Sequence, residues 1–342
     1  MSAAAVVLIF VNLLSADVPR GMENFTPLKR LSRARWDAWL LLMTLLSCCL
    51  FGDLCEFVGS LATFGCIFLV AFGHGDARYA AKKFAACHFL ALILCACAEI
   101  LAKAHPFGES QTAAPLYAIA FGILTAAYPL NNWTDSFFSR APSYFLSIWL
   151  VIVRPLVASL LLTTIGCVPL QNASRLACEI AACLAFASLL FVPILFFAKV
   201  ELQRIVSLVT SWQSGYLWLF ALHFSEKFYD AIVLFAITQG IFIAIISHVA
   251  SALTTRGGTD SIGNLSGLFE SDYFSAVFVA SSFVFLMAMP IVFIVKNFHS
   301  DMSLTVIYAA AAGTILPSIF CHKICALMKK SSATPDGNGT PL

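Results

Sequence analysis

The chain consists of long apolar runs separated by short polar segments. A membrane-spanning helix needs about 20 mainly apolar residues. About 11 stretches meet or approach this length, namely residues 1–16, 36–52, 54–72, 84–102, 113–130, 143–168, 176–198, 205–223, 229–253, 272–295 and 303–328. The first has the length of a signal peptide but lacks a basic start, so we interpret it as a span. The pattern predicts an all-α polytopic membrane protein, with a single transmembrane domain over 1–330 and a disordered cytoplasmic tail over 331–342.

Composition supports the same class. Of the 342 residues, 60% are hydrophobic and only 11% are charged, whereas a soluble domain carries about 25% charged residues. These values exclude a soluble globular enzyme, a nucleic-acid-binding protein and a disordered chain. The net charge of +2 is too small to indicate a polyanionic partner.

The 12 cysteines do not indicate a metal or disulfide framework. Most lie in apolar runs, where cysteine behaves as a small hydrophobic residue. Cys321, His322 and Cys325 come nearest to a metal-binding group, but they have no further ligands at the same helix end. We therefore predict neither a metal nor a cofactor.

The distribution of Lys and Arg predicts the orientation. With the N-terminus outside, most of these residues fall in inward segments, and the outward side keeps only Lys103, Arg175, Lys227 and Lys296. Because positively charged residues accumulate on the inner side of a membrane, we expect an N-out, C-in topology. Arg154 belongs to neither side, since it falls inside a helix.

Four ionisable residues fall within or at the ends of predicted spans: Glu56, Glu99, Arg154 and Lys296. A charge at membrane depth is costly, so it is a candidate for function. Each also has a structural interpretation. Glu56 fits a membrane interface, Glu99 fits a surface pair with Lys103 four residues later, Lys296 fits snorkelling to headgroups, and Arg154 fits a structural partner for carbonyls beside Pro155.

Prolines inside spans are a second signal. Pro155, Pro193, Pro290 and Pro317 each remove a backbone donor. Such breaks are tolerated where the backbone is buried in protein or lines a cavity. The closeness of Pro290 to Lys296 predicts a broken helix near Pro290 beside a charge, with an ordinary proline kink as the alternative.

Five segments carry a resemblance to one membrane-protein family, and they occur in its order. The segment GILTAAYPLNNWTDSFFSRAP (122–142) keeps the spacing of a seventh-helix signature at Pro129, Leu130, Trp133 and Ala141-Pro142. The segment ELQRIVSLVTSWQSGYL (201–217) keeps the register of a second signature at Leu202, Arg204, Gln213, Gly215 and Tyr216. The segment TDSIGNLSGLF (259–269) is similar to the loop before a broken twelfth helix, and LMAMPIVFIVKNF (286–298) is similar to that helix. The apolar segment 303–328, with ICALMKK at its end, is similar to the helix that follows.

These signatures resemble those of the proton-translocating antiporter-like family. The family comprises membrane-arm subunits of respiratory complex I (NADH-quinone oxidoreductase) and the large subunits of Mrp-type cation/proton antiporters. The similarity covers roughly residues 50–328 and is closest to the N-type (ND-two-like) branch of complex I and the D-type branch of the Mrp antiporters. It implies an antiporter-like fold in a divergent and shortened form.

The resemblance also implies a proton pathway. Carried over by position, Glu56 matches the fifth-helix Glu, Arg154 the eighth-helix Lys and Lys296 the twelfth-helix Lys. Two positions depart from the family pattern, since Leu124 replaces the seventh-helix Lys and Asn131 replaces its His partner. Arg154 is a third departure, because a guanidinium is effectively always protonated.

The function expected from this resemblance is that of a membrane-arm subunit of complex I or a related cation/proton antiporter complex, with other integral membrane subunits and the bilayer as partners. Such a subunit is not catalytic alone. The alternatives are a non-conducting scaffold subunit of such a complex and an independent secondary transporter. The expected location is a bacterial inner membrane, and a mitochondrial inner membrane would be topologically equivalent.

Overall fold

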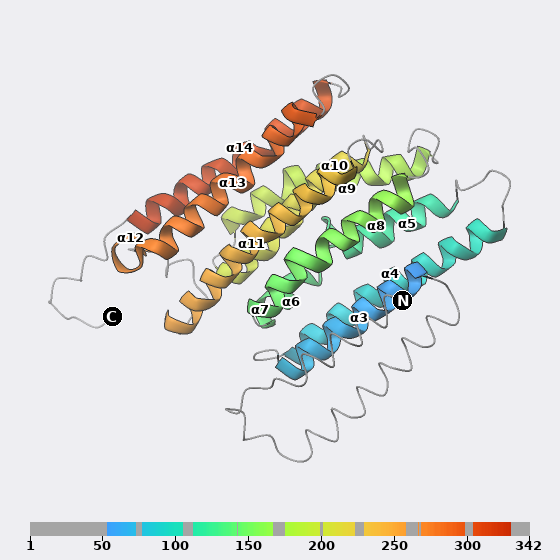
Figure 1. Cartoon of the computed structure of the whole chain (residues 1–342), viewed down its shortest axis with the longest axis horizontal. Coiled ribbons are helices and arrows are strands. Elements are labelled where there is room, and N and C mark those ends of the chain that lie inside the picture. Colours follow the sequence, from blue (N-terminus) through green and yellow to red (C-terminus); the bar gives the residue numbers. More distant parts are fainter. Residues whose placement is uncertain are drawn as a thin grey trace, which may run out of the picture. The chain divides into compact units, whose positions relative to one another are not determined.

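The computed structural model describes residues 53–72, 77–104, 112–141, 143–166, 175–198, 201–222, 229–257, 266, 268–297 and 304–329. The predicted helices over 1–16 and 36–52 and the predicted tail over 331–342 lie outside these residues. Every regular element in the described ranges is helical (Figure 1). The chain divides into two compact units, which are described separately.

The first unit contains helices α3 (Asp53–Phe72), α4 (Ala77–Ala104), α5 (Ala113–Leu124) and α6 (Thr134–Arg140). Its centre is aromatic. The ring of Phe84 stacks on His88 at 3.8 Å between centroids and on Phe137 at 5.0 Å, and it meets Trp133 edge-on. Gly65 of α3 lies directly against Phe84, so its missing side chain allows α3 and α4 to pack closely.

The stretch over 113–130 is not one helix, which corrects the predicted span. Helix α5 ends at Leu124, and Ala126 takes a left-handed backbone conformation with φ of 61°. Pro129 prevents a helix from continuing through the rest of this stretch, because it disfavours helical backbone at Tyr128. The indole nitrogen of Trp133 donates to the carbonyl of Ile123 at 2.9 Å, which links the segment after the break to the end of α5.

We expect the Trp133→Phe variant to lower the free energy of unfolding by about 1–3 kcal/mol, because it removes one buried hydrogen bond and part of a buried ring. The carbonyl of Ile123 keeps its bond to the backbone N–H of Ala126 at 3.1 Å, which limits the loss. Thermal unfolding in detergent measures the change. An unaltered melting temperature would show that the Trp133 contact contributes nothing to stability.

The second unit is built around one buried helix. It contains α7 (Ser143–Ile148), a π-helical turn η1 (Trp149–Val153), α8 (Arg154–Gly166) and most of α9 (Arg175–Ala198). It continues with α10 (Leu202–Leu222), α11 (Tyr229–Gly257), α12 (Leu268–Ser271), α13 (Tyr273–Asn297) and α14 (Leu304–Lys329). Helix α10 is almost wholly buried, with α8, α9, α11 and α14 among its neighbours.

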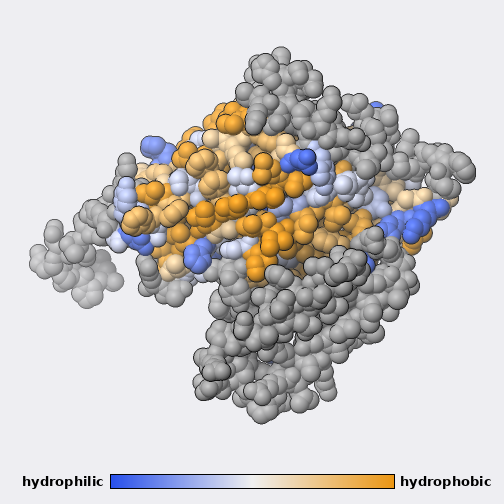
Figure 2. Space-filling view, in the orientation of Figure 1, coloured by the Kyte–Doolittle hydropathy of each residue, from blue (hydrophilic) through white to orange (hydrophobic). Residues whose placement is uncertain are grey.

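Lengths and surfaces confirm a polytopic membrane protein. Within the described residues, six spans are long and apolar enough to cross a bilayer: Ala77–Ala104, Phe145–Thr164, Arg175–Ala198, Leu202–Leu222, Tyr229–Thr254 and Tyr273–Ile294. Large apolar side chains such as Phe191, Leu234 and Phe274 are exposed, and Figure 2 shows apolar side chains gathered along the face in view. Such surfaces match a hydrocarbon environment.

The break predicted near Pro290 is wrong. Helix α13 runs continuously from Tyr273 to Asn297 with Pro290 inside it. Pro290 cannot donate to the carbonyl of Leu286, which lies four residues earlier. The side chain of Gln213 donates to that carbonyl instead, at 3.0 Å, so the helix continues without an unpaired acceptor there.

Candidate functional site

Helix α10 brings polar side chains into the interior of the second unit. All of its side chains from Leu202 to Ala221 are buried except Arg204. Thr210, Gln213 and Ser214 lie near the middle of this span. In membrane proteins, polar side chains face the bundle interior and join helices through hydrogen bonds. Helix α10 is therefore the element around which a polar site can form.

Arg154 lies beside this helix and is 3% exposed. Its Nη1 donates to Oε1 of Gln239 at 3.5 Å. Its Nη2 donates to the carbonyl of Thr210 and to the hydroxyl of Ser214, both at 3.4 Å. All of these acceptors are neutral. The guanidinium is thus held between α8, α10 and α11 near the middle of their spans.

No carboxylate pairs with Arg154 among the described residues. The ion pairs found there join Lys103 to Glu99, Arg175 to Glu179 and Arg204 to Glu201. The Nε atom of Arg154 also has no hydrogen-bond partner within the described part of the chain. The site therefore presents a buried positive charge with one unused donor, at a depth where charges are costly.

The backbone before Arg154 is widened. Residues Trp149–Val153 form a π-helical turn, in which the N–H of Arg154 donates to the carbonyl of Trp149. Such turns often occur at functional sites. Gly240 of α11 packs directly on this turn, since a Cβ at Gly240 would lie 2.1 Å from the carbonyl oxygen of Leu150. This close approach brings the neighbouring Gln239 within reach of Arg154.

Two glutamines extend the network from Arg154 to α13. Nε2 of Gln239 donates to Oε1 of Gln213, and Nε2 of Gln213 donates to the carbonyl of Leu286. We call Gln239 and Gln213 the amide relay. It links the charge on α8 to the one carbonyl that Pro290 leaves without its helical donor.

The first unit contains a separate pair of carboxylates. Glu56 on α3 is 8% exposed, and its Oε1 has no hydrogen-bond partner among the described residues. Glu99 on α4 lies 3.9 Å from the ammonium group of Lys103, which confirms the predicted i,i+4 pair.

The predicted proton-pathway residues are therefore distributed over both units. Glu56 belongs to the first unit, and Arg154 and Lys296 belong to the second. Lys296 lies in the last turn of α13, and the position of its side chain is outside what the structure describes. Their role as one pathway stays a prediction.

Sequence reasoning did not name Gln239 and Ser214 as site residues. It used Gln213 only as a position in a signature. The available signal was a long amide side chain in the middle of an apolar run, as at Gln239 in FAITQGIFIAII. An amide in that position needs an internal hydrogen-bond partner, because lipid offers none.

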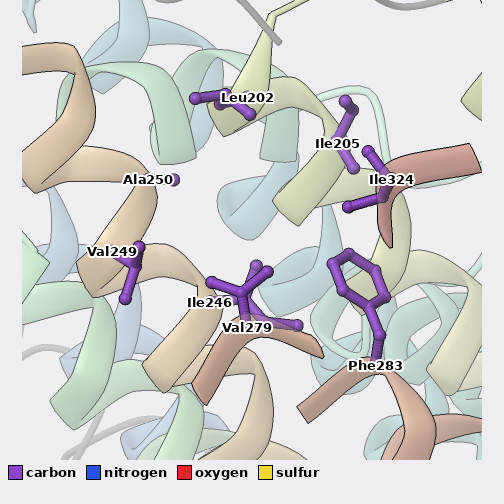
Figure 3. Close-up of a pocket in the computed structure, with 8 residues that line it drawn as sticks. All are labelled: Leu202, Ile205, Ile246, Val249, Ala250, Val279, Phe283 and Ile324. Carbon is purple, nitrogen blue, oxygen red and sulfur yellow. The ribbon is translucent and has the colours of Figure 1, made fainter. Parts of the chain in front are cut away.

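A pocket in the second unit lies apart from these polar residues. It is lined by Leu202, Ile205, Ile246, Val249, Ala250, Val279, Phe283 and Ile324, and all of these side chains are apolar (Figure 3). It therefore offers no side-chain hydrogen-bonding group to a ligand. Across the described ranges, no group of three or more His, Cys, Asp or Glu residues could hold a metal ion.

Comparison with known proteins gives a structural likeness. No protein-family model matches the chain, and no curated protein does. The structure is similar to a chain of the membrane-bound sulfane sulfur reductase, an archaeal respiratory membrane complex. The TM-score is 0.67 at 14% sequence identity, and the match covers 95% of this chain and 70% of the other. At this identity the likeness shows the fold.

Proposed function

We propose that this chain is an integral membrane-arm subunit of a proton-translocating respiratory complex, of the complex I or Mrp-type class. The observation that carries the proposal is Arg154, a buried charge near mid-span with only neutral acceptors around it. The likeness to a chain of a respiratory membrane complex supports the same class. Other integral membrane subunits are the partners that such a role requires.

In this proposal Arg154 is a fixed positive charge rather than a carrier of protons, because a guanidinium does not readily deprotonate. Two unit charges about 4 Å apart interact by about 4 kcal/mol at an effective dielectric constant near 20. A fixed cation therefore influences whether nearby sites hold a proton. Glu56 and Lys296 are the groups of the proposed polar axis that exchange protons.

The experiment is proton uptake by inverted membrane vesicles, with assembly of the complex followed on native gels. We expect Arg154→Ala and Glu56→Gln each to reduce proton flux by about tenfold or more while the complex remains assembled. The matched controls are Arg175→Ala and Glu179→Gln, which alter an exposed ion pair. Their flux should equal that of the wild type.

A second candidate is a non-conducting scaffold subunit of such a complex. It is favoured by the chemistry of the amide relay, whose members are neutral amides that do not exchange protons by titration. The same vesicles distinguish the two functions. Unchanged flux in both variants, together with loss of the complex when the chain is deleted, would replace translocation with the scaffold.

A further inference from the structure

The direction of every hydrogen bond in the amide relay is fixed by its two ends. At one end, the carbonyl of Leu286 can only accept, so Gln213 must present its NH₂ group there. At the other end, the guanidinium of Arg154 can only donate, so Gln239 must present its oxygen. Both requirements leave the oxygen of Gln213 facing the NH₂ group of Gln239, as observed.

The carbonyl of Leu286, which accepts the hydrogen bond from Gln213, is buried and has no helical donor. Leu286 is 0% exposed, so solvent does not reach this residue. Pro290 removes the backbone donor that would pair with its carbonyl, and the proline ring also clashes with a carbonyl four residues earlier and kinks the helix. A buried acceptor without a partner is costly. Gln213 meets this need from another helix.

We propose that the amide relay is a conformational coupling device. The side chain of Gln213 supplies the hydrogen-bond donor that the backbone lacks at Pro290, and it thereby sets the path of α13 under the influence of Arg154. Hydrogen bonds in a chain polarise one another in a low-dielectric interior. The positive charge of Arg154 therefore strengthens the bond at Leu286. This goes beyond the proposed function, because it holds whether or not protons move.

The coupling acts on a segment that ends in a charged residue. Lys296 follows Pro290 by six residues on the same helix. The path of α13 at Pro290 sets where its last turns lie, and with them the backbone of Lys296. Gln213 and Gln239 are thus positioning residues that connect a charge on α8 to the far end of α13.

The first test is hydrogen–deuterium exchange of the full chain in lipid nanodiscs, followed in α13 peptides covering residues 284–297. We expect Gln213→Leu to speed exchange in these peptides by about tenfold, because the Leu286 carbonyl loses its donor. The matched control is Gln203→Leu, a buried glutamine on the same helix outside the relay. It should leave α13 exchange within about twofold of the wild type.

A rescue variant separates this role from general destabilisation. Pro290→Ala restores a backbone N–H four residues after Leu286. In the Pro290→Ala background, Gln213→Leu should change α13 exchange by less than about twofold. The inference is overturned if Gln213→Leu has the same effect in both backgrounds, or if Pro290→Ala fails to recover a Gln213→Leu chain that folds poorly.

A second pair of variants tests the end of the relay at Arg154. Arg154→Met should speed α13 exchange by about threefold, because the relay loses its charged donor. In a Gln239→Leu background, Arg154→Met should have a clearly smaller effect, since only the contacts of Arg154 with Thr210 and Ser214 on α10 are left to lose. Equal effects of Arg154→Met with and without Gln239 would show that Arg154 acts on α13 by another route, and would overturn this half of the inference.

Discussion

Replacing Gly240 with alanine is expected to destabilise the second unit by about 3 kcal/mol, the upper end of the usual cost of overpacking. The added Cβ would lie 2.1 Å from the oxygen and 2.8 Å from the carbon of the Leu150 carbonyl. Both atoms belong to backbone, so no side-chain rotation relieves the contact. Helix α11 must move away from the π-helical turn, which also withdraws Gln239 from Arg154.

Thermal unfolding in detergent measures this loss. The matched control is Gly313→Ala, because a Cβ there would meet Leu189 side-chain atoms at 3.3 Å, and these can shift. We expect the control to lower the melting temperature far less than Gly240→Ala. Equal melting temperatures for the two variants would mean that the turn at Leu150 yields easily, and that Gly240 does not fix the approach of α11.

Removing the aromatic ring at Phe84 should be the most damaging change in the first unit. Phe84 is 0% exposed and stacks on His88 and Phe137. Truncation of a buried Phe to Ala costs about 3–5 kcal/mol, because the lost contacts leave a cavity. Phe84→Ala should therefore unfold this unit well below the wild-type temperature. Limited proteolysis of α3 and α4 during a temperature series measures the temperature at which this unit unfolds.

The control for this variant is Phe89→Ala on the same helix, where the side chain is 51% exposed. Its ring has few protein contacts to lose, so we expect proteolysis to begin close to the wild-type temperature. A similar loss of protection in both variants would show that apolar content, rather than the stacked cluster, stabilises the unit.

The positions of the spans could be predicted because length and hydropathy are local properties. The predicted span over 229–253 corresponds to helix α11 (Tyr229–Gly257), and that over 176–198 to α9 (Arg175–Ala198). Arg154 could be singled out for the same reason, since a charge inside an apolar run must be accommodated within the protein. The structure places it 3% exposed, as a buried charge requires.

Backbone breaks could not be predicted from these properties. The residues over 113–128 remain almost wholly apolar, so hydropathy continues past the point where α5 ends. At Pro290, by contrast, the helix continues although the proline predicts a break. The donor that keeps α13 continuous comes from Gln213, 73 residues earlier in the chain, and a contact of that range is not encoded in any local pattern.

The burial of α10 has a consequence for how the protein is made. Its span is the least apolar of the six, and it is also the most completely enclosed. Translocon-mediated entry into the bilayer depends on hydropathy, yet α11 and α14, which cover parts of α10, are synthesised after it. We therefore expect α10 to remain beside the insertion machinery until these later helices emerge, so that the innermost helix of the unit is among the last to settle in the membrane.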